Sequence, residues 1–200
     1  MAAANGGDID VQWDLLLEHA TADTDTGLVK IQLRRPRQQI LADVPRSMGL
    51  VDKSLVEVFR GLTTGKAPWP LFLWGPAGSG KTRACLSLCD HIQGSRYVTV
   101  REACDAVMSS GFRRWECDQE DSLPLFVLDE LGTRLKAGDL EYSTIMEIFD
   151  SRERRWQNVA IYVSNLAPRD LAIQYDDRIA SRVLSGTVFW LDDVDRRQKR

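Results

Sequence analysis

The sequence predicts an α/β fold in which five parallel strands form a sheet that helices cover on both faces. Two observations carry this prediction. Short apolar runs alternate along the chain with longer segments whose apolar residues recur at helical spacing, and this alternation is typical of three-layer α/β architectures. A glycine-rich turn also joins the first apolar run to a helix, as in the phosphate-binding loops of parallel sheets.

The expected strands are short runs rich in apolar and β-branched residues. They cover residues 71–74, 96–100, 125–128, 159–163 and 187–191. Each expected helix instead carries apolar residues along one side. The helices cover residues 54–62, the segment after the glycine-rich turn to about residue 92, residues 102–108 and 139–156, and most of 170–184.

Composition narrows the possible classes of protein. The chain has 200 residues, of which 44% are hydrophobic, and a formal net charge of −3. It suits one domain with a short appendage, and any contact with nucleic acid would have to come from a local basic patch. No apolar run reaches the length of a membrane span, and the start of the sequence does not resemble a signal peptide. We therefore expect a cytoplasmic protein.

Residues 1–48 differ in composition from the rest and are too few to bury a core of their own. Residues 1–7 are small and polar and are expected to be disordered, residues 9–20 could form an amphipathic helix, and residues 21–27 suggest a loop. Residues 1–48 would therefore either dock on the rest of the chain or bind a partner. We interpret them as a partly disordered extension that binds a partner, and residues 49–200 as the folded core.

The most informative motif lies between residues 71 and 82. Four apolar residues lead into G-x-x-x-x-G-K-T, a loop that consists of Gly75, Pro76, Ala77, Gly78, Ser79, Gly80, Lys81 and Thr82. Its glycines let backbone N–H groups curl around phosphate, and the N-terminus of the following helix attracts the same anion. Lys81 would reach the β- and γ-phosphates, and the Thr82 hydroxyl would bind magnesium. The loop therefore predicts ATP and Mg²⁺ as ligands.

An acidic pair, Asp129 and Glu130, follows the expected strand at 125–128. Behind a phosphate-binding loop, such a pair predicts that Asp129 holds the Mg²⁺ with Thr82, while Glu130 orients and deprotonates the attacking water. The alternative is two solvated acids at the start of a loop. A glutamate directly after the metal ligand favours hydrolysis by water over transfer to a substrate hydroxyl.

Further polar candidates follow the next strand and lie on a late helix. Asn165, at the tip of the strand at 159–163, could contact the γ-phosphate, or it could cap the helix that begins near Pro168. Arg178 and Arg182 lie one turn apart on one helix face. They could pair with nearby acids, or one of them could act as an arginine finger in the site of a neighbouring subunit.

The order of these motifs resembles the helicase-loader group of AAA+ ATPases, which includes bacterial replicative helicase loaders and the ATP-binding proteins of insertion sequences (DnaC/IstB-like). The resemblance covers about residues 45–195. It rests on the loop at 71–82, the acidic run at 129–132, the strand tip at 163–166, the run Asp177-Arg178-Ile179-x-Ser181-Arg182 and the segment 148–152. It implies an AAA+ type P-loop NTPase in residues 49–200, with the helical lid missing or reduced to residues 192–200.

The resemblance also implies roles for single residues. The catalytic set would be Lys81, Glu130, Asn165, Arg178 and Arg182, with Arg182 as first choice for the finger that acts in trans. DNA contacts in such proteins can come from the region after the second strand. Here that region holds the run Phe112-Arg113-Arg114-Trp115, with Arg101 nearby. Arginines beside aromatic rings suit single strands, although a solvated basic loop is an equal alternative.

From these implications we expect a replicative helicase loader that binds and hydrolyses ATP and in which ATP acts as a switch. Its expected partners are further copies of itself, a replicative helicase or a transposase, and single-stranded or duplex DNA. The alternatives are the ATPase subunit of a transposition system, a small-molecule or nucleoside kinase, and a nucleotide-binding adaptor that turns over poorly.

Overall fold

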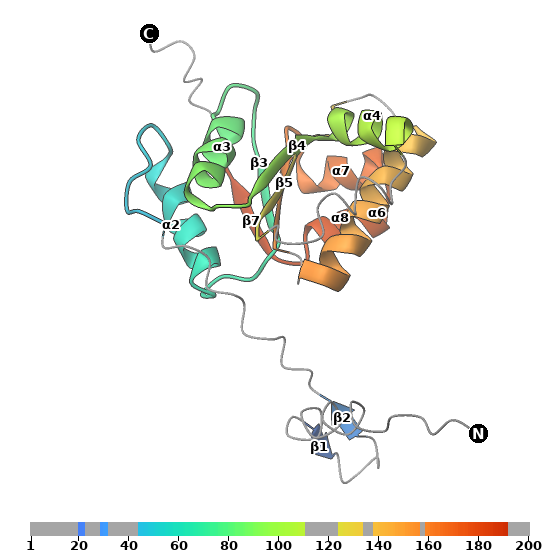
Figure 1. Ribbon diagram of the computed structural model, residues 1–200, viewed down its shortest axis with the longest axis horizontal. Coiled ribbons are helices and arrows are strands. Elements are labelled where there is room, and N and C mark those ends of the chain that lie inside the picture. Colours follow the sequence, from blue (N-terminus) through green and yellow to red (C-terminus); the bar gives the residue numbers. More distant parts are fainter. Residues whose placement is uncertain are drawn as a thin grey trace, which may run out of the picture. The chain divides into compact units, whose positions relative to one another are not determined.

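The computed structural model describes residues 20–22, 29–31, 44–110, 124–133, 138–156 and 159–191 (Figure 1). The chain forms two compact units, residues 1–39 and residues 40–200. In the second unit, Val44 and Met48 are buried in the core, ahead of the first helix. The division that the sequence suggested at residue 48 stays a prediction.

The second unit contains the five-stranded parallel sheet that the sequence predicted. Its strands are β3 (Leu71–Trp74), β4 (Arg96–Thr99), β5 (Phe126–Leu131), β6 (Ala160–Ser164) and β7 (Thr187–Trp190). They lie in the order β4-β5-β6-β3-β7, and every neighbouring pair is parallel. Strand β6 therefore lies between β3 and β5, and the carboxyl ends of all three strands share one edge of the sheet.

Helices cover both faces of this sheet (Figure 1). On one face lie α2 (Lys53–Thr63) and α3 (Lys81–His91), and on the other lie α4 (Val100–Ser110), α6 (Asp139–Trp156), α7 (Pro168–Gln174) and α8 (Asp177–Val183). Each layer encloses its own apolar cluster, so alternate side chains of the strands face opposite clusters. No described helix is both long and apolar enough to cross a lipid bilayer.

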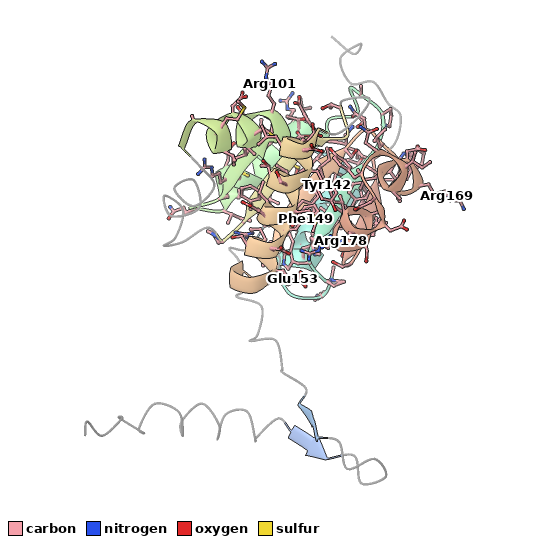
Figure 2. All side chains as sticks on the ribbon, turned by 90° about the vertical axis from the view of Figure 1, so that its right-hand side faces the viewer. Arg101, Tyr142, Phe149, Glu153, Arg169 and Arg178 are labelled. Atoms are coloured by element: carbon pink, nitrogen blue, oxygen red, sulfur yellow. The ribbon has the colours of Figure 1, made fainter. Side chains whose placement is uncertain are left out.

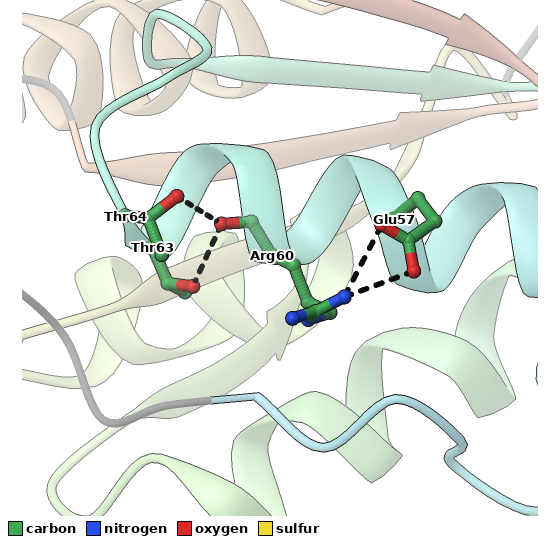
Figure 3. A network of polar contacts seen from close by, with 4 residues as sticks. All are labelled: Glu57, Arg60, Thr63 and Thr64. Carbon is green, nitrogen blue, oxygen red and sulfur yellow. Dashed lines mark hydrogen bonds and ion pairs between the residues drawn. The ribbon is translucent and has the colours of Figure 1, made fainter.

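Helix α2 shows how its sequence determines both of its ends. The carboxylate of Asp52 accepts the Ser54 N–H at 2.8 Å and so caps the first turn. In the last turn the hydroxyls of Thr63 and Thr64 donate to the Arg60 carbonyl, while the Arg60 guanidinium pairs with Glu57 at 3.1 Å (Figure 3). The Asp52 bond thus occupies a backbone N–H that the start of a helix leaves unpaired, while the threonine hydroxyls share a carbonyl that also accepts the Thr64 N–H.

Two details of the core refine the sequence-based expectation. The segment 170–184 is mostly helix as expected, but it is divided, because Asp176 caps a new helix by accepting the Ile179 N–H at 2.9 Å, which separates α7 from α8. Strand β5 continues past residue 128 to Leu131, so that Asp129 and Glu130 lie within the strand instead of after it.

The first unit contains strands β1 (Ala20–Ala22) and β2 (Val29–Ile31), which pair antiparallel. The expected end of a helix at Ala20 and the expected start of a loop at Thr21 are therefore wrong. Both residues belong to a ladder whose partner strand lies several residues further along the chain, and local composition does not reveal such pairing. The rest of the helix expected over residues 9–20 lies outside the described residues.

Candidate nucleotide-binding site

The loop between β3 and α3 requires glycine at its start. A Cβ atom on Gly75 would lie 2.3 Å from the carbonyl oxygen of Leu191, which no side chain tolerates. At the other end Gly80 has a φ of 99°, in the left-handed region that favours glycine, and it forms the N-cap of α3. No side chain caps the first turn of α3, so its N–H groups suit an anion such as phosphate.

The Lys81 side chain lies across this loop and is buried. Its ammonium group donates to the carbonyls of Gly75 at 2.7 Å and Pro76 at 2.8 Å, and it lies 3.4 Å from the Ser79 hydroxyl. These contacts hold the positive charge of Lys81 against the loop that would bind phosphate. This is the position that the loop motif gives to its lysine.

Asp129 receives hydrogen bonds from three elements and is only 3% exposed. The hydroxyls of Thr82, on α3, and Tyr97, on β4, both donate to its Oδ2 at 2.7 Å. The N–H of Glu130 donates to its Oδ1 at 2.6 Å. Thr82 and Asp129, which are 47 positions apart in sequence, thus bring together the hard oxygen donors that Mg²⁺ prefers. The donor set fits the ion that the sequence predicted there.

The groups around Asp129 stay protonated at neutral pH. Burial raises the pKa of Tyr97, and its hydrogen bond to Asp129 raises it further. Burial also raises the pKa of the Cys85 thiol, and the nearby Asp129 adds to this effect while Lys81 opposes it. Tyr97 therefore acts as a hydrogen-bond donor to Asp129, and Cys85 is an unreactive core residue.

Glu130 occupies a distorted position in β5. Its φ is 67°, which makes it the one non-glycine among the described residues with a backbone in the left-handed region. The pairing of β5 with β6 also shifts register between Leu128 and Leu131, so β5 contains one extra residue there. Such a bulge re-aims a side chain, and Glu130 is exposed although both of its neighbours, Asp129 and Leu131, are buried. Strain of this kind concentrates at functional sites.

A cleft of about 440 Å³ connects these features. Its lining comes from the loop, the first two turns of α3 and the ends of β5 and β6: Ala77, Gly78, Gly80, Lys81, Thr82, Arg83, Leu86, Asp129, Glu130, Thr133 and Asn165. The structure thus brings together the predicted residues Lys81, Thr82, Asp129, Glu130 and Asn165. Sequence reasoning missed Arg83, Leu86 and Thr133, which no motif marks.

Asn165 follows β6 at the centre of this edge. It does not cap the next helix, because the N-cap of α7 is Ala167, without a side-chain hydrogen bond. The buried Ser164 hydroxyl shapes the turn instead: it donates to the Leu131 carbonyl at 2.7 Å and accepts the Leu166 N–H at 2.9 Å. This leaves Asn165 exposed at the margin of the cleft.

Arg178 and Arg182 do not line the cleft of their own chain. Arg182, on α8, forms an ion pair with Asp150 and lies 3.7 Å from Glu153, both on α6. Arg178 is exposed beside α6, near Tyr142 and Asp176 (Figure 2). The run Phe112-Arg113-Arg114-Trp115 and the reduced lid expected at 192–200 lie outside the described residues.

Comparison with solved structures identifies the fold. DnaA from Aquifex aeolicus, bound to AMPPCP, matches with a TM-score of 0.60 and 20% identity over 74% of this chain and 49% of that one. DnaI matches with a TM-score of 0.57 and 20% identity over 80% of this chain and all of that one. The DnaC helicase loader matches with a TM-score of 0.52 and 19% identity over 61% and 77%.

The fold is the AAA+ P-loop fold. At this level of identity the likeness establishes architecture. The sequence motifs resemble those of helicase loaders, and the structural similarity to DnaC and DnaI agrees with that resemblance. The chain spans about half the length of the Aquifex aeolicus DnaA chain and of a DNA replication initiation factor that it also matches. Neither a protein-family model nor a curated protein matches the sequence.

Proposed function

We propose that the protein binds and hydrolyses ATP with Mg²⁺ and acts as a switch on DNA, most specifically as a cytoplasmic loader of a replicative helicase. One observation carries the hydrolytic assignment. Glu130 is exposed to the cleft from a strained bulge, directly after the buried Asp129 that bonds Thr82 of the phosphate-binding loop. This arrangement supports an attack by water, with the carboxylate as general base.

Each cleft residue that the motifs include then has a role. Lys81 binds the β- and γ-phosphates, Thr82 and Asp129 hold the metal, and the backbone of the loop surrounds the phosphates. The metal, when bound, neutralises the charge that develops on the phosphate oxygens. Glu130 accepts the proton of the attacking water, and Asn165 orients that water against the γ-phosphate.

We assign Arg182 to the site of a neighbouring subunit, with Arg178 as its neighbour or substitute. One observation supports this: neither arginine lines the cleft of its own chain. Arg182 pairs with Asp150 and Glu153 of α6, as the alternative interpretation predicted, so a role in trans requires it to exchange these acids for the neighbouring site. A guanidinium supplied in trans makes hydrolysis depend on a homo-oligomer, which lets ATP govern assembly.

The helicase-loading role rests on structural similarity to the DnaC helicase loader and DnaI together with the motif order. Residues 1–48 would form the arm that binds the helicase, and the run at 112–115 would contact single-stranded DNA. A deletion that tests the arm has to stop at residue 39, because Val44 and Met48 belong to the core. That variant is expected to hydrolyse ATP like the full chain and to lose binding to a replicative helicase.

The first test of hydrolysis compares the full chain with Glu130→Gln. We expect turnover to fall at least about 100-fold, because a general base contributes that much or more, while the affinity for ATP changes little. ATPase rates and nucleotide titrations measure the two effects. Unchanged turnover would remove Glu130 from the mechanism, and phosphate transfer to an added nucleoside would identify a kinase.

The second test addresses the shared site by mixing variants. Arg182→Ala and Glu130→Gln proteins are each expected to be nearly inactive, and their mixture is expected to regain activity, because a mixed interface unites an intact Glu130 with an intact Arg182. Arg169→Ala is the matched control, since Arg169 is an exposed arginine on α7 that points away from the protein (Figure 2). A mixture no more active than its components would refute the assignment in trans.

A further inference from the structure

The Asp129 carboxylate has a hydrogen-bond partner that the nucleotide motifs do not include. Thr82 and Asp129 belong to them, but the third group in the cluster is the hydroxyl of Tyr97, which bonds the same oxygen, Oδ2, at the same distance of 2.7 Å. Thr82 is exposed, Tyr97 is half-buried and Asp129 is buried, so the cluster lies between the cleft and the core.

The register of the sheet explains how Tyr97 reaches this carboxylate. Strands β4 and β5 are parallel, with Tyr97 opposite Val127 and Thr99 opposite Asp129. Tyr97 therefore lies on the same side of the sheet as Asp129, two residues before the position opposite it. The long phenol side chain covers this distance. A shorter side chain at position 97 would not place a hydroxyl at the end of β5.

The hydroxyl of Tyr97 is not needed to fill space. The ring packs against the apolar cluster beneath α2 and α3, and a phenylalanine ring would make the same contacts. The oxygen adds the bond to Asp129. This bond matters for a cation because an ionised carboxylate with two donors on one oxygen cannot turn freely. The Thr82 hydroxyl, by donating its one proton to that oxygen, keeps its lone pairs for a cation.

We propose that Tyr97 is a positioning residue for magnesium: its hydroxyl holds the Asp129 carboxylate in the orientation in which Asp129 and Thr82 together receive the ion. This inference rests on the nucleotide site proposed above. Tyr97 acts through Asp129 and contacts neither nucleotide nor metal. Outer-shell hydrogen bonds of this kind typically change metal affinity about 10- to 100-fold.

The test measures the affinity of the full chain for a fluorescent ATP analogue, first with excess EDTA and then across a Mg²⁺ titration. For Tyr97→Phe we expect the Mg²⁺ concentration that gives the half-maximal gain in affinity to rise about 10-fold, while the affinity in EDTA stays within about twofold of the unmodified chain. Tyr142→Phe is the matched control: it removes a hydroxyl that donates to another aspartate, Asp176, at 2.7 Å. Its Mg²⁺ dependence should not change.

A second variant separates positioning from a general structural effect. In an Asp129→Asn background, Tyr97→Phe is expected to add nothing to the Mg²⁺ dependence, because the residue through which it acts is already changed. An unchanged Mg²⁺ dependence in Tyr97→Phe would overturn the inference about Tyr97 but not the proposed site. A full effect of Tyr97→Phe on the Mg²⁺ dependence in the Asp129→Asn background would do the same. If Asp129→Asn itself leaves the Mg²⁺ dependence unaltered, the proposed site fails, and the inference fails with it.

Discussion

At the scale of single residues, Glu130 has a backbone conformation that glycine would adopt more easily. Its φ of 67° costs a residue with a side chain about 1–3 kcal/mol, whereas glycine adopts it without strain. The surrounding ladder of β5 and β6 and the Asp129 carboxylate, which accepts the Glu130 N–H, hold the backbone there. The strain is stored at the residue proposed to activate water.

We predict that Glu130→Gly abolishes hydrolysis and does not lower the free energy of unfolding, which instead rises by up to about 1 kcal/mol because the strain is removed. Urea unfolding followed by circular dichroism measures the change. Glu130→Ala is the control: it removes the same carboxylate but keeps a Cβ atom at positive φ, so it should be no more stable than the unmodified chain. A marked loss of stability in Glu130→Gly would contradict this account.

The sequence predicted the residues of the phosphate-binding loop and the acidic pair because the residues of each motif are consecutive in the chain. It did not predict Tyr97 or Tyr175, whose roles depend on which strands and helices meet. Tyr97 reaches Asp129 through the parallel register of β4 with β5, and no local pattern reports that register. The bulge at Glu130 could not be predicted either, since it arises from a shift in the pairing register between β5 and β6.

At the scale of elements, buried polar contacts attach the α7–α8 region to the cleft. The Tyr175 hydroxyl, in the turn between α7 and α8, accepts the Gly132 N–H at 2.8 Å and donates to Glu141 of α6 at 2.7 Å. Gly132 lies two residues after Glu130 on the same bulged segment. One hydroxyl therefore links the end of β5, the start of α6 and the arginine-bearing helix.

We expect Tyr175→Phe to lower the free energy of unfolding by about 1–3 kcal/mol, because it deprives the buried Glu141 carboxylate and the Gly132 N–H of a partner. Denaturant titration measures the loss. Tyr142→Phe provides the comparison, since its hydrogen bond to Asp176 is equally short, but Asp176 is only half-buried whereas Glu141 is buried. Equal losses in the two variants would mean that burial of the Tyr175 bond contributes nothing.

The pattern of helices and strands was read from the sequence with small shifts at their ends, since apolar spacing defines which face of an element is buried. The segment 170–184 is mostly helix as expected, but the break between α7 and α8 was not predicted, because the aspartate that caps α8 looked like one more acid in a charged stretch. The sheet order could be predicted only through the resemblance, because alternation alone does not determine which strands are neighbours.

At the scale of the whole molecule, all four tyrosines of the chain have raised pKa values. Burial is the first cause for Tyr97, Tyr162 and Tyr175, and a hydrogen bond to Asp176 is the first cause for Tyr142. The folded state therefore keeps its phenol protons at a pH at which the unfolded chain has lost them. Stability from these groups is complete below about pH 10 and falls as the pH rises above it.

We predict that Tyr97, Tyr162 and Tyr175 do not ionise in the native protein near the ordinary pKa of about 10, and that they ionise together when alkaline unfolding occurs. The near-ultraviolet absorbance of tyrosinate follows ionisation, and circular dichroism follows unfolding. For the fully buried Tyr162, each pH unit above 10 costs about 1.4 kcal/mol of stability. A tyrosine that titrates near pH 10 while the fold is intact would refute the raised value for that residue.

The contacts of Lys81 have a consequence for how the proposed ATP-driven switch would reset. Its ammonium group already donates to the Gly75 and Pro76 carbonyls, so a phosphate must compete with the loop for that charge. Hydrogen bonds to charged groups are worth about 1.5–3 kcal/mol, so the loop is an effective rival. In the proposed reaction, the carbonyls would regain the lysine more readily once hydrolysis had removed the γ-phosphate. The loop would then contain its own competitor for ATP, which would favour release after the proposed hydrolysis.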